Sequence, residues 1–312
     1  MAVASQVLDG VHVALVTPAR EDGTLDAEGL ERLVERAVAG GVHGISPVGS
    51  TGEGPKMSAA QRAAVVRRVR ACTPAGLPVI PGVPAVTLDA AVAELGELAE
   101  AGASAALVSP PSYYPLSDDD VLHLYRALAD RSALPLLLYN IPAFTKVRIA
   151  PQVAAALAAH PRVAGLKDSS RDMEYLQQVL QACAGADFGV FTGTDTLLVP
   201  SLLAGARGAI AASANLVPEL GVGVYRAFAA GDIPGALALQ QTLCTVVAAC
   251  RRGDFPAGWK AALEVAGVCA AHPVLPGTPL PAAQRADLAA RLDAVLPDAV
   301  LPAPASSGPA PA

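Results

Sequence analysis

Short apolar runs alternate with longer amphipathic stretches along most of this chain of 312 residues. Each run has the length of a strand, and each stretch between two runs is rich in Ala, Leu, Val and charged residues, as in a helix that covers a sheet. The pattern predicts strands at Val11–Thr17, Gly44–Gly49, Pro78–Val83, Ala105–Ser109, Leu134–Asn140, Val163–Lys167, Phe188–Thr192 and Gly208–Ser213.

Several of the predicted helices carry recognisable start and stop signals. Ser58 followed by Gln61 fits a capping box, and Ser117 precedes three aspartates that suit the first turn of a helix. Glycines are expected to end helices at Gly40, Gly102 and Gly205.

Strand–helix units at this short spacing predict an α/β fold, a (β/α)₈ TIM barrel over residues 1–214. A doubly wound open sheet is the alternative, but no G-x-G-x-x-G sequence follows the first strand. Residues 215–296 show only helical patterning, which predicts a C-terminal bundle of about three helices packed on the barrel. The Pro/Ala-rich tail, residues 297–312, is predicted to be disordered.

Composition narrows the possible partners. The chain is 53% hydrophobic and 16% charged, its net charge is −6, and no basic patch stands out, so nucleic acid is not an expected partner. The N-terminus lacks the regions of a signal peptide, and no apolar run reaches membrane-spanning length without Gly, Pro or charge. A membrane is therefore not an expected partner either.

The five cysteines are scattered and form no C-x-x-C pair, which is typical of reduced thiols in a cytoplasmic protein. The five histidines are dispersed as well, and nothing resembles a cluster of zinc or iron ligands. We therefore expect no metal and no other cofactor, which disfavours a metal-dependent aldolase.

Lys167 ends an otherwise apolar, strand-like run, and a buried amine must be paired or have its pKa lowered. A lysine tuned in this way can attack a ketone and form a Schiff base. Arginine cannot do so, and the chain has only three other lysines, Lys56, Lys146 and Lys260, none of which ends a strand-like run. The alternative is a surface lysine at a strand terminus.

Two further segments end predicted strands and should meet Lys167 at the same rim of a barrel. The turn that contains Ser50 and Thr51 has two glycines, so its backbone N–H groups can approach an anion such as a carboxylate. Tyr139 can relay protons to and from a forming carbinolamine. Read singly, these are a plain polar turn and a half-buried aromatic residue, so their joint placement carries the argument.

With these motifs the sequence resembles the dihydrodipicolinate synthase / N-acetylneuraminate lyase family of class I, pyruvate-dependent aldolases, from about Val11 to about Arg291. The motifs are Gly49-Ser50-Thr51-Gly52-Glu53, Ser109-Pro110-Pro111-Ser112-Tyr113-Tyr114-Pro115, Tyr139-Asn140-Ile141-Pro142, Gly165-Leu166-Lys167-Asp168, Gly193-Thr194-Asp195 and Gly208-Ala209-Ile210.

The resemblance implies a role for each site residue. Lys167 would form the imine with pyruvate or another 2-oxo acid, and Tyr139 would relay protons with help from Thr51 and Tyr113. In relatives the counterpart of Tyr113 reaches a neighbouring subunit's site, which implies a homodimer or homotetramer. The residues implied to bind substrate are Ser50, Thr51, Gly193, Asp195, Ile210 and Phe144.

Departures from the family pattern bear on the substrate. Phe144 stands where dihydrodipicolinate synthases usually carry an arginine for a substrate carboxylate, and nearby Lys146 or Arg148 is a conceivable substitute. The Asp-Glu pair of N-acetylneuraminate lyases appears here as Asp195-Thr196, and a serine of the eighth strand as Ala212. A long sugar acid is therefore disfavoured.

These observations predict a Schiff-base lyase that cleaves or forms a 4-hydroxy-2-oxo acid to give pyruvate and an aldehyde. The expected substrates are 2-keto-3-deoxy sugar acids or acids similar to 4-hydroxy-2-oxoglutarate. Two alternatives use the same imine, namely a 2-keto-3-deoxy acid dehydratase and a 4-hydroxy-tetrahydrodipicolinate synthase. A third, from another class, is an idle barrel that only binds a 2-oxo acid.

Overall fold

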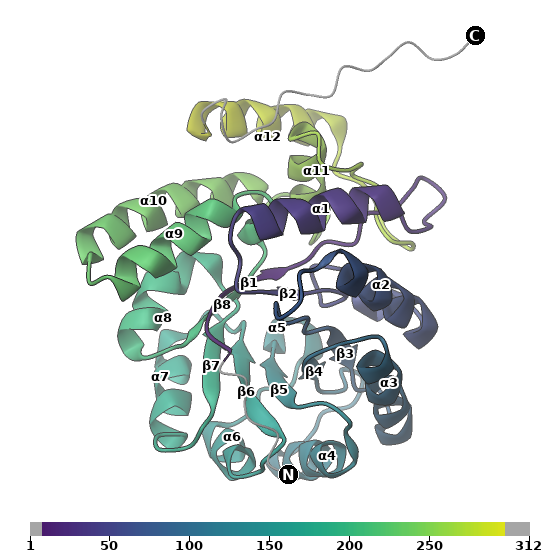
Figure 1. Ribbon diagram of the computed structural model, residues 1–312, viewed down its shortest axis with the longest axis vertical. Coiled ribbons are helices and arrows are strands. Elements are labelled where there is room, and N and C mark those ends of the chain that lie inside the picture. The colour runs from purple at the N-terminus through teal and green to yellow at the C-terminus, as the bar shows by residue number, and fades with distance from the viewer. Residues whose placement is uncertain (1–7, 297–312) are drawn as a thin grey trace.

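The computed structural model describes residues 8–296, so the tail predicted to be disordered lies outside the described residues. Eight parallel strands form one sheet in the order β2-β1-β8-β7-β6-β5-β4-β3 (Figure 1). The strands are β1 Gly10–Ala14, β2 Gly44–Ser46, β3 Gly82–Pro84, β4 Ala106–Ser109, β5 Leu136–Asn140, β6 Val163–Asp168, β7 Gly189–Thr192 and β8 Gly208–Ala211.

The two ends of the sheet meet, so the predicted barrel is confirmed. Ile45 of β2 donates its N–H to the carbonyl of Pro78 at 2.9 Å and accepts from the N–H of Ile80 at 2.8 Å. The strands here are shorter than expected, because Pro47, Pro78 and Pro81 have no N–H to donate to a ladder. Their carbonyls still accept bonds, and Pro47 receives the N–H of Gly82 at 3.0 Å.

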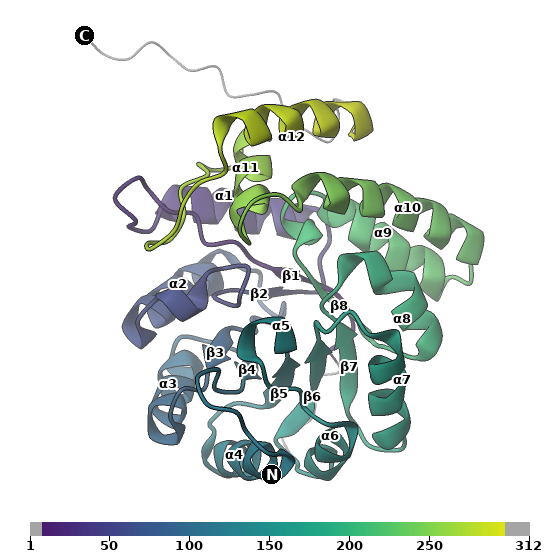
Figure 2. The same cartoon turned by 180° about the vertical axis from the view of Figure 1, so that it is seen from behind.

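Helices surround the strands on all sides (Figures 1 and 2). The capping box predicted at Ser58 is formed, and the acidic first turn predicted after Ser117 is present, with Asp120 completing a second capping box. Gly40 and Gly205 cap the helices that end there. The helices up to β8 are α1 Ala27–Ala39, α2 Ala59–Cys72, α3 Leu88–Glu100, α4 Asp118–Arg131, α5 Pro142–Thr145, α6 Pro151–Ala158, α7 Met173–Ala182 and α8 Leu198–Ala204.

Up to residue 296, four α-helices follow β8, where about three were expected: α9 Pro218–Ala229, α10 Ile233–Cys250, α11 Ala257–Val265 and α12 Ala282–Val295. The first of them, α9, packs on β1 and α8 and so completes the ring around the barrel. The remaining three form the C-terminal extension, and α11 and α12 lie together beyond α1 (Figure 2). The boundary predicted at residue 214 stays a prediction, but the packing of α9 favours one after this helix.

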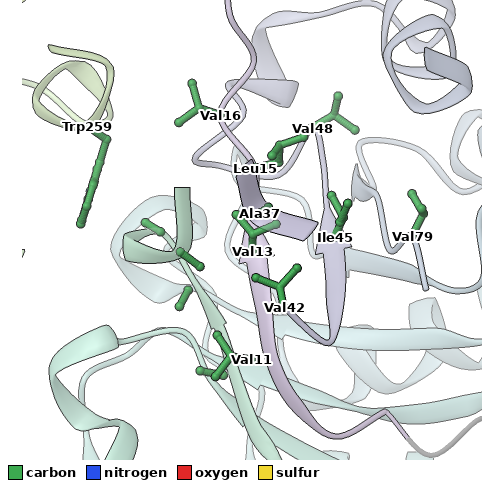
Figure 3. Close-up of a cluster of buried hydrophobic side chains, with 14 of the residues drawn as sticks. Val11, Val13, Leu15, Val16, Ala37, Val42, Ile45, Val48, Val79 and Trp259 are labelled. Carbon is green, nitrogen blue, oxygen red and sulfur yellow. The ribbon is translucent and has the colours of Figure 1, made fainter. Parts of the chain in front are cut away.

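Strand side chains alternate between two hydrophobic clusters. Val11 and Val13 of β1 face outward and belong, with Ala37 of α1, to the larger cluster between the strands and the outer helices (Figure 3). Leu137 and Tyr139 of β5 belong instead to the smaller cluster that fills the barrel interior with, among others, Ile80, Leu107, Phe191 and Ile210. This alternation decides which strand residues can reach a site inside the barrel.

Among the described residues, α10 is the one helix long and apolar enough to span a membrane by length and composition alone. It packs against α9 and α12, and 39% of its 18 residues are buried inside the protein, so a core helix accounts for the same pattern. All five cysteines are free thiols.

A buried ion pair fastens the C-terminal extension to the barrel. Lys260 of α11 has a side chain that is 1% exposed, and its Nζ lies 2.6 Å from the Glu53 carboxylate in the turn after β2. Glu53 also pairs with Lys56 at 2.7 Å and accepts the N–H of Val274. Burial lowers the pKa of Lys260, and Glu53 opposes that shift. The charge of Lys260 therefore depends on this carboxylate.

We predict that Glu53→Gln lowers the free energy of unfolding by about 3–5 kcal/mol, because it leaves a buried ammonium without its partner. Lys260→Met added to Glu53→Gln should recover part of that loss. Urea unfolding of the two single variants and the double variant measures the coupling.

The matched control is Glu31→Gln, which breaks the solvent-exposed pair with Arg68. Its cost should stay within about 1 kcal/mol. Additive losses for Glu53→Gln and Lys260→Met would show that the two buried charges do not depend on each other.

Candidate active site

The register between β5 and β6 places Lys167 beside Tyr139, inside the barrel. The two residues are directly paired across the strands, and Leu138 and Leu166, which precede them, both face the outer helices. Lys167 is 5% exposed. Its Nζ donates to the Tyr139 hydroxyl at 3.4 Å and lies 4.6 Å from the centre of the Tyr139 ring. The amine therefore sits at the polar end of the barrel interior, next to a phenol.

No carboxylate of residues 8–296 lies within ion-pair distance of the Lys167 amine, in contrast to Lys260. The adjacent carboxylate of Asp168 is engaged elsewhere: it accepts from Asn140 Nδ2 at 2.7 Å and from the Ser170 hydroxyl at 2.8 Å. Burial raises the pKa of Asp168, and these hydrogen bonds oppose the rise. The Lys167 amine thus forms a hydrogen bond to a phenol and no ion pair, so it is free to attack a carbonyl carbon.

The turn after β2 supplies the hydroxyl groups that the sequence predicted. Ser50 Oγ lies 3.4 Å from the Tyr139 hydroxyl, so serine, tyrosine and lysine form one connected set. Thr51 is buried beside it. Thr17, which follows β1, fixes the position of the turn, because its hydroxyl donates to the carbonyl of Gly52 at 2.7 Å.

A cavity of about 360 Å³ opens at the carboxyl ends of the strands and contains the Lys167 side chain. This is the rim at which (β/α)₈ barrels carry their sites. The residues singled out from the sequence that line it are Ser50, Thr51, Tyr139, Phe144, Lys167, Gly193, Asp195 and Ile210.

Gly193 and Asp195 shape the wall of the cavity after β7. A Cβ atom on Gly193 would lie 2.7 Å from Lys167 Cε and 2.0 Å from Ser169 Oγ, so only glycine leaves the lysine its present position. Asp195 is buried, and one carboxylate oxygen accepts the N–H of Ser213 at 2.7 Å. Asp195 therefore braces the two neighbouring strand ends.

Tyr113 is the predicted site residue that does not line the cavity. It is 87% exposed, in the segment between β4 and α4, and its ring meets that of Tyr114 edge-on at 4.9 Å between centres. The expectation that it reaches a neighbouring subunit stays a prediction.

Phe144 is 52% exposed and lies 5.9 Å, ring centre to ring centre, from Phe255. Both rings also line an adjoining, largely apolar cavity of about 270 Å³. Neither residue considered as a substitute for the missing arginine lines the Lys167 cavity. Lys146 donates to the carbonyl of Ala143, and Arg148 pairs with Asp172 at 2.5 Å.

The lining residues that the sequence analysis did not predict include Arg171, Arg251 and Trp259. Arg171 follows Lys167 in the polar segment after β6, and this position gave a weak sequence signal that it could line the site. Arg251 and Trp259 belong to the C-terminal extension, and nothing in an apolar helical pattern shows that its end folds over a barrel mouth. Within residues 8–296, no three His, Cys, Asp or Glu side chains are placed to hold a metal ion.

The chain is similar to known proteins over most of its length. Residues 7–295 match the dihydrodipicolinate synthetase family. An uncharacterized DapA-like lyase of Halobacterium salinarum is 38% identical over 83% of this chain and 85% of its own length. A 4-hydroxy-tetrahydrodipicolinate synthase of Methanoculleus marisnigri is 32% identical over 86% of this chain and 93% of its own.

Among solved structures, YagE of E. coli K12, a prophage protein of the dihydrodipicolinic acid synthase family in complex with pyruvate, superimposes with a TM-score of 0.88. It is 28% identical and covers 93% of this chain and 99% of its own. The chain belongs to the dihydrodipicolinate synthetase family and is a Schiff-base lyase.

Proposed function

We propose that this lyase cleaves, or in reverse forms, a 4-hydroxy-2-oxo acid, giving pyruvate and an aldehyde, through an imine on Lys167. The observation that carries the proposal is an amine inside the cavity, 3.4 Å from a phenol and without an ion-pair partner among the described residues. The complex of the related YagE with pyruvate supports the choice of 2-oxo acid.

Imine formation begins with attack of Lys167 Nζ on the C2 carbonyl carbon. The carbinolamine loses water after protons pass between nitrogen and oxygen, and Tyr139 is placed to carry them. The Tyr139 hydroxyl lies next to the Ser50 hydroxyl, which can accept the proton from Tyr139 and return it. The substrate carboxylate would bind at the turn of Ser50 and Thr51, with Ile210 beneath it.

Cleavage then draws on the iminium as an electron sink. Tyr139, which has given its proton to the departing water, takes the proton of the 4-hydroxyl, the C3–C4 bond breaks, and its electrons move through C3 and C2 to the iminium nitrogen. The aldehyde leaves, the resulting enamine takes a proton at C3, and water hydrolyses the iminium to pyruvate and free Lys167. Atoms and charges balance without a cofactor.

The rival assignments on the same imine differ in the bond that breaks or in the acceptor. A 2-keto-3-deoxy acid dehydratase would expel water and release no pyruvate. A 4-hydroxy-tetrahydrodipicolinate synthase, the activity named for the Methanoculleus relative, would condense pyruvate with aspartate semialdehyde. Phe144 disfavours the latter, because a phenyl ring gives a carboxylate no donors. An idle barrel would do none of these.

The proposed assembly is a homodimer or homotetramer in the cytoplasm. The 87% exposure of Tyr113, a tyrosine that the family resemblance places near a site, supports a partner that covers it. Five free thiols agree with a reducing compartment.

We predict that Lys167→Ala abolishes pyruvate release from a panel of 4-hydroxy-2-oxo acids, because only this amine can form the imine. Tyr139→Phe should lower kcat by about 10²- to 10⁴-fold, the usual share of a proton-transfer group. Pyruvate is measured by coupled reduction with lactate dehydrogenase.

Lys146→Ala is the matched control, since this exposed lysine lies outside the cavity, and it should keep the parent rate. Full activity of Lys167→Ala would refute the imine mechanism. Loss of substrate without pyruvate would favour the dehydratase.

We predict that Gly193→Ala lowers kcat/KM by about 10²-fold, because the added methyl group displaces Lys167 from its position beside Tyr139. Gly96→Ala in α3 is the matched control, since its methyl group meets nothing within 4 Å. Gly96→Ala should keep the parent rate and stabilise the protein slightly. Equal rates for the two variants would show that Lys167 tolerates displacement.

A further inference from the structure

Two arginines that have no role in the proposed mechanism line the Lys167 cavity. Arg171 lies in the segment between β6 and α7, and Arg251 is the residue at which α10 ends. Together with the iminium that Lys167 forms in the proposed mechanism, they make three cationic groups in the cavity wall, against a single carboxylate, Asp195, which already accepts the N–H of Ser213. The cavity therefore carries more positive charge than one substrate carboxylate needs.

Neither guanidinium group forms a polar contact within the described part of the protein. Across residues 8–296, the side chains of Arg171 and Arg251 make no hydrogen bond and no ion pair. The neighbouring arginines behave differently, because Arg148 pairs with Asp172 at 2.5 Å and Arg252 with Asp287 at 2.8 Å. Five donors on each of two guanidinium groups thus remain available at the cavity.

The backbone holds Arg171 in one place despite its polar, exposed surroundings. Its φ of 65° lies in the left-handed region, which a residue other than glycine rarely adopts. Hydrogen bonds fix both flanks: Ser170 donates its N–H and its hydroxyl to Asp168, and Asp172 donates its N–H to Ser170 Oγ and caps α7. The arginine is therefore presented from a fixed point rather than from a loose loop.

Arg251 and Arg171 line the same cavity, so the two charges act on each other. Burial lowers the pKa of Arg251, the charge of Arg171 lowers it further, and the carboxylate of Asp195 opposes the shift. Two like charges at one cavity repel, and an anion between them would reverse that cost, because guanidinium groups bind carboxylates and phosphates with paired N–H donors.

We propose that Arg171 and Arg251 form a subsite for an acidic group at the far end of the substrate, so the aldehyde half carries a carboxylate or a phosphate. This inference rests on the proposed function, in which Lys167 and the turn of Ser50 and Thr51 hold the 2-oxo acid end. Phe144 carries no positive charge, and Arg171 and Arg251 would supply that charge from the β6–α7 segment and the end of α10.

Binding tests the subsite without turnover, because Trp259 lines the same cavity and is the one tryptophan of the chain. Trp259 fluorescence is titrated with 2-oxoglutarate and with 2-oxopentanoate, which have the same chain length but end in a carboxylate and a methyl group. The parent should bind 2-oxoglutarate at least tenfold more tightly. Arg171→Gln and Arg251→Gln should each weaken that binding about tenfold and leave 2-oxopentanoate unchanged.

Arg148→Gln is the matched control, since this arginine is paired outside the cavity, and it should bind both ligands as the parent does. Equal affinity of the parent for the two ligands, or an equal effect of the arginine variants on both, would overturn the subsite and leave the proposed function standing.

Turnover then distinguishes the two acids. Pyruvate release is compared for 4-hydroxy-2-oxo acids of matched length that end in a methyl group, a carboxylate or a phosphate. The subsite predicts a higher kcat/KM for one acidic ending, lost in Arg171→Gln mainly through KM. The same rate for all three endings would contradict it. Pyruvate from none of them, with ligand binding intact, would count against the proposed function alone.

Discussion

The chemistry of this protein depends on the register between β5 and β6. Because Tyr139 is paired with Lys167 and both point into the barrel, the amine and the phenol lie 3.4 Å apart at the polar end of an apolar interior. A shift by one residue would turn Lys167 toward the outer helices and bring Leu166 inside. The packing of Leu138 and Leu166 against the helices therefore fixes the site as surely as any polar contact.

Two buried lysines in one chain serve opposite purposes. Lys260 forms an ion pair with Glu53, and this pair joins the C-terminal extension to the turn that also carries Ser50 and Thr51. Lys167 has a phenol for a neighbour and no carboxylate of the described chain within ion-pair distance, so its nitrogen can react. Burial alone thus does not mark a reactive amine, and the partner of the amine decides.

The barrel and Lys167 could be predicted from sequence because both follow from local patterning. Strand-like apolar runs alternate with helical stretches, and Lys167 is a polar residue at the end of one such run. Strands β2 and β3 are shorter than predicted, because the predicted runs contain Pro47, Pro78 and Pro81, which have no N–H to donate, and an apolar pattern does not reveal that loss. Arg251, Trp259 and the burial of Lys260 could not be predicted. Each depends on how the C-terminal helices fold back over the barrel mouth, and their partners lie far away in the sequence.

The measurement that tests the central claim most directly is borohydride reduction in the presence of pyruvate, followed by intact mass and peptide mapping. The account predicts one reduced pyruvyl adduct, located on Lys167 and absent from the ion-paired Lys260. An adduct on another lysine would contradict the role of Lys167. No adduct on the folded protein would contradict the imine mechanism and favour a barrel that only binds a 2-oxo acid.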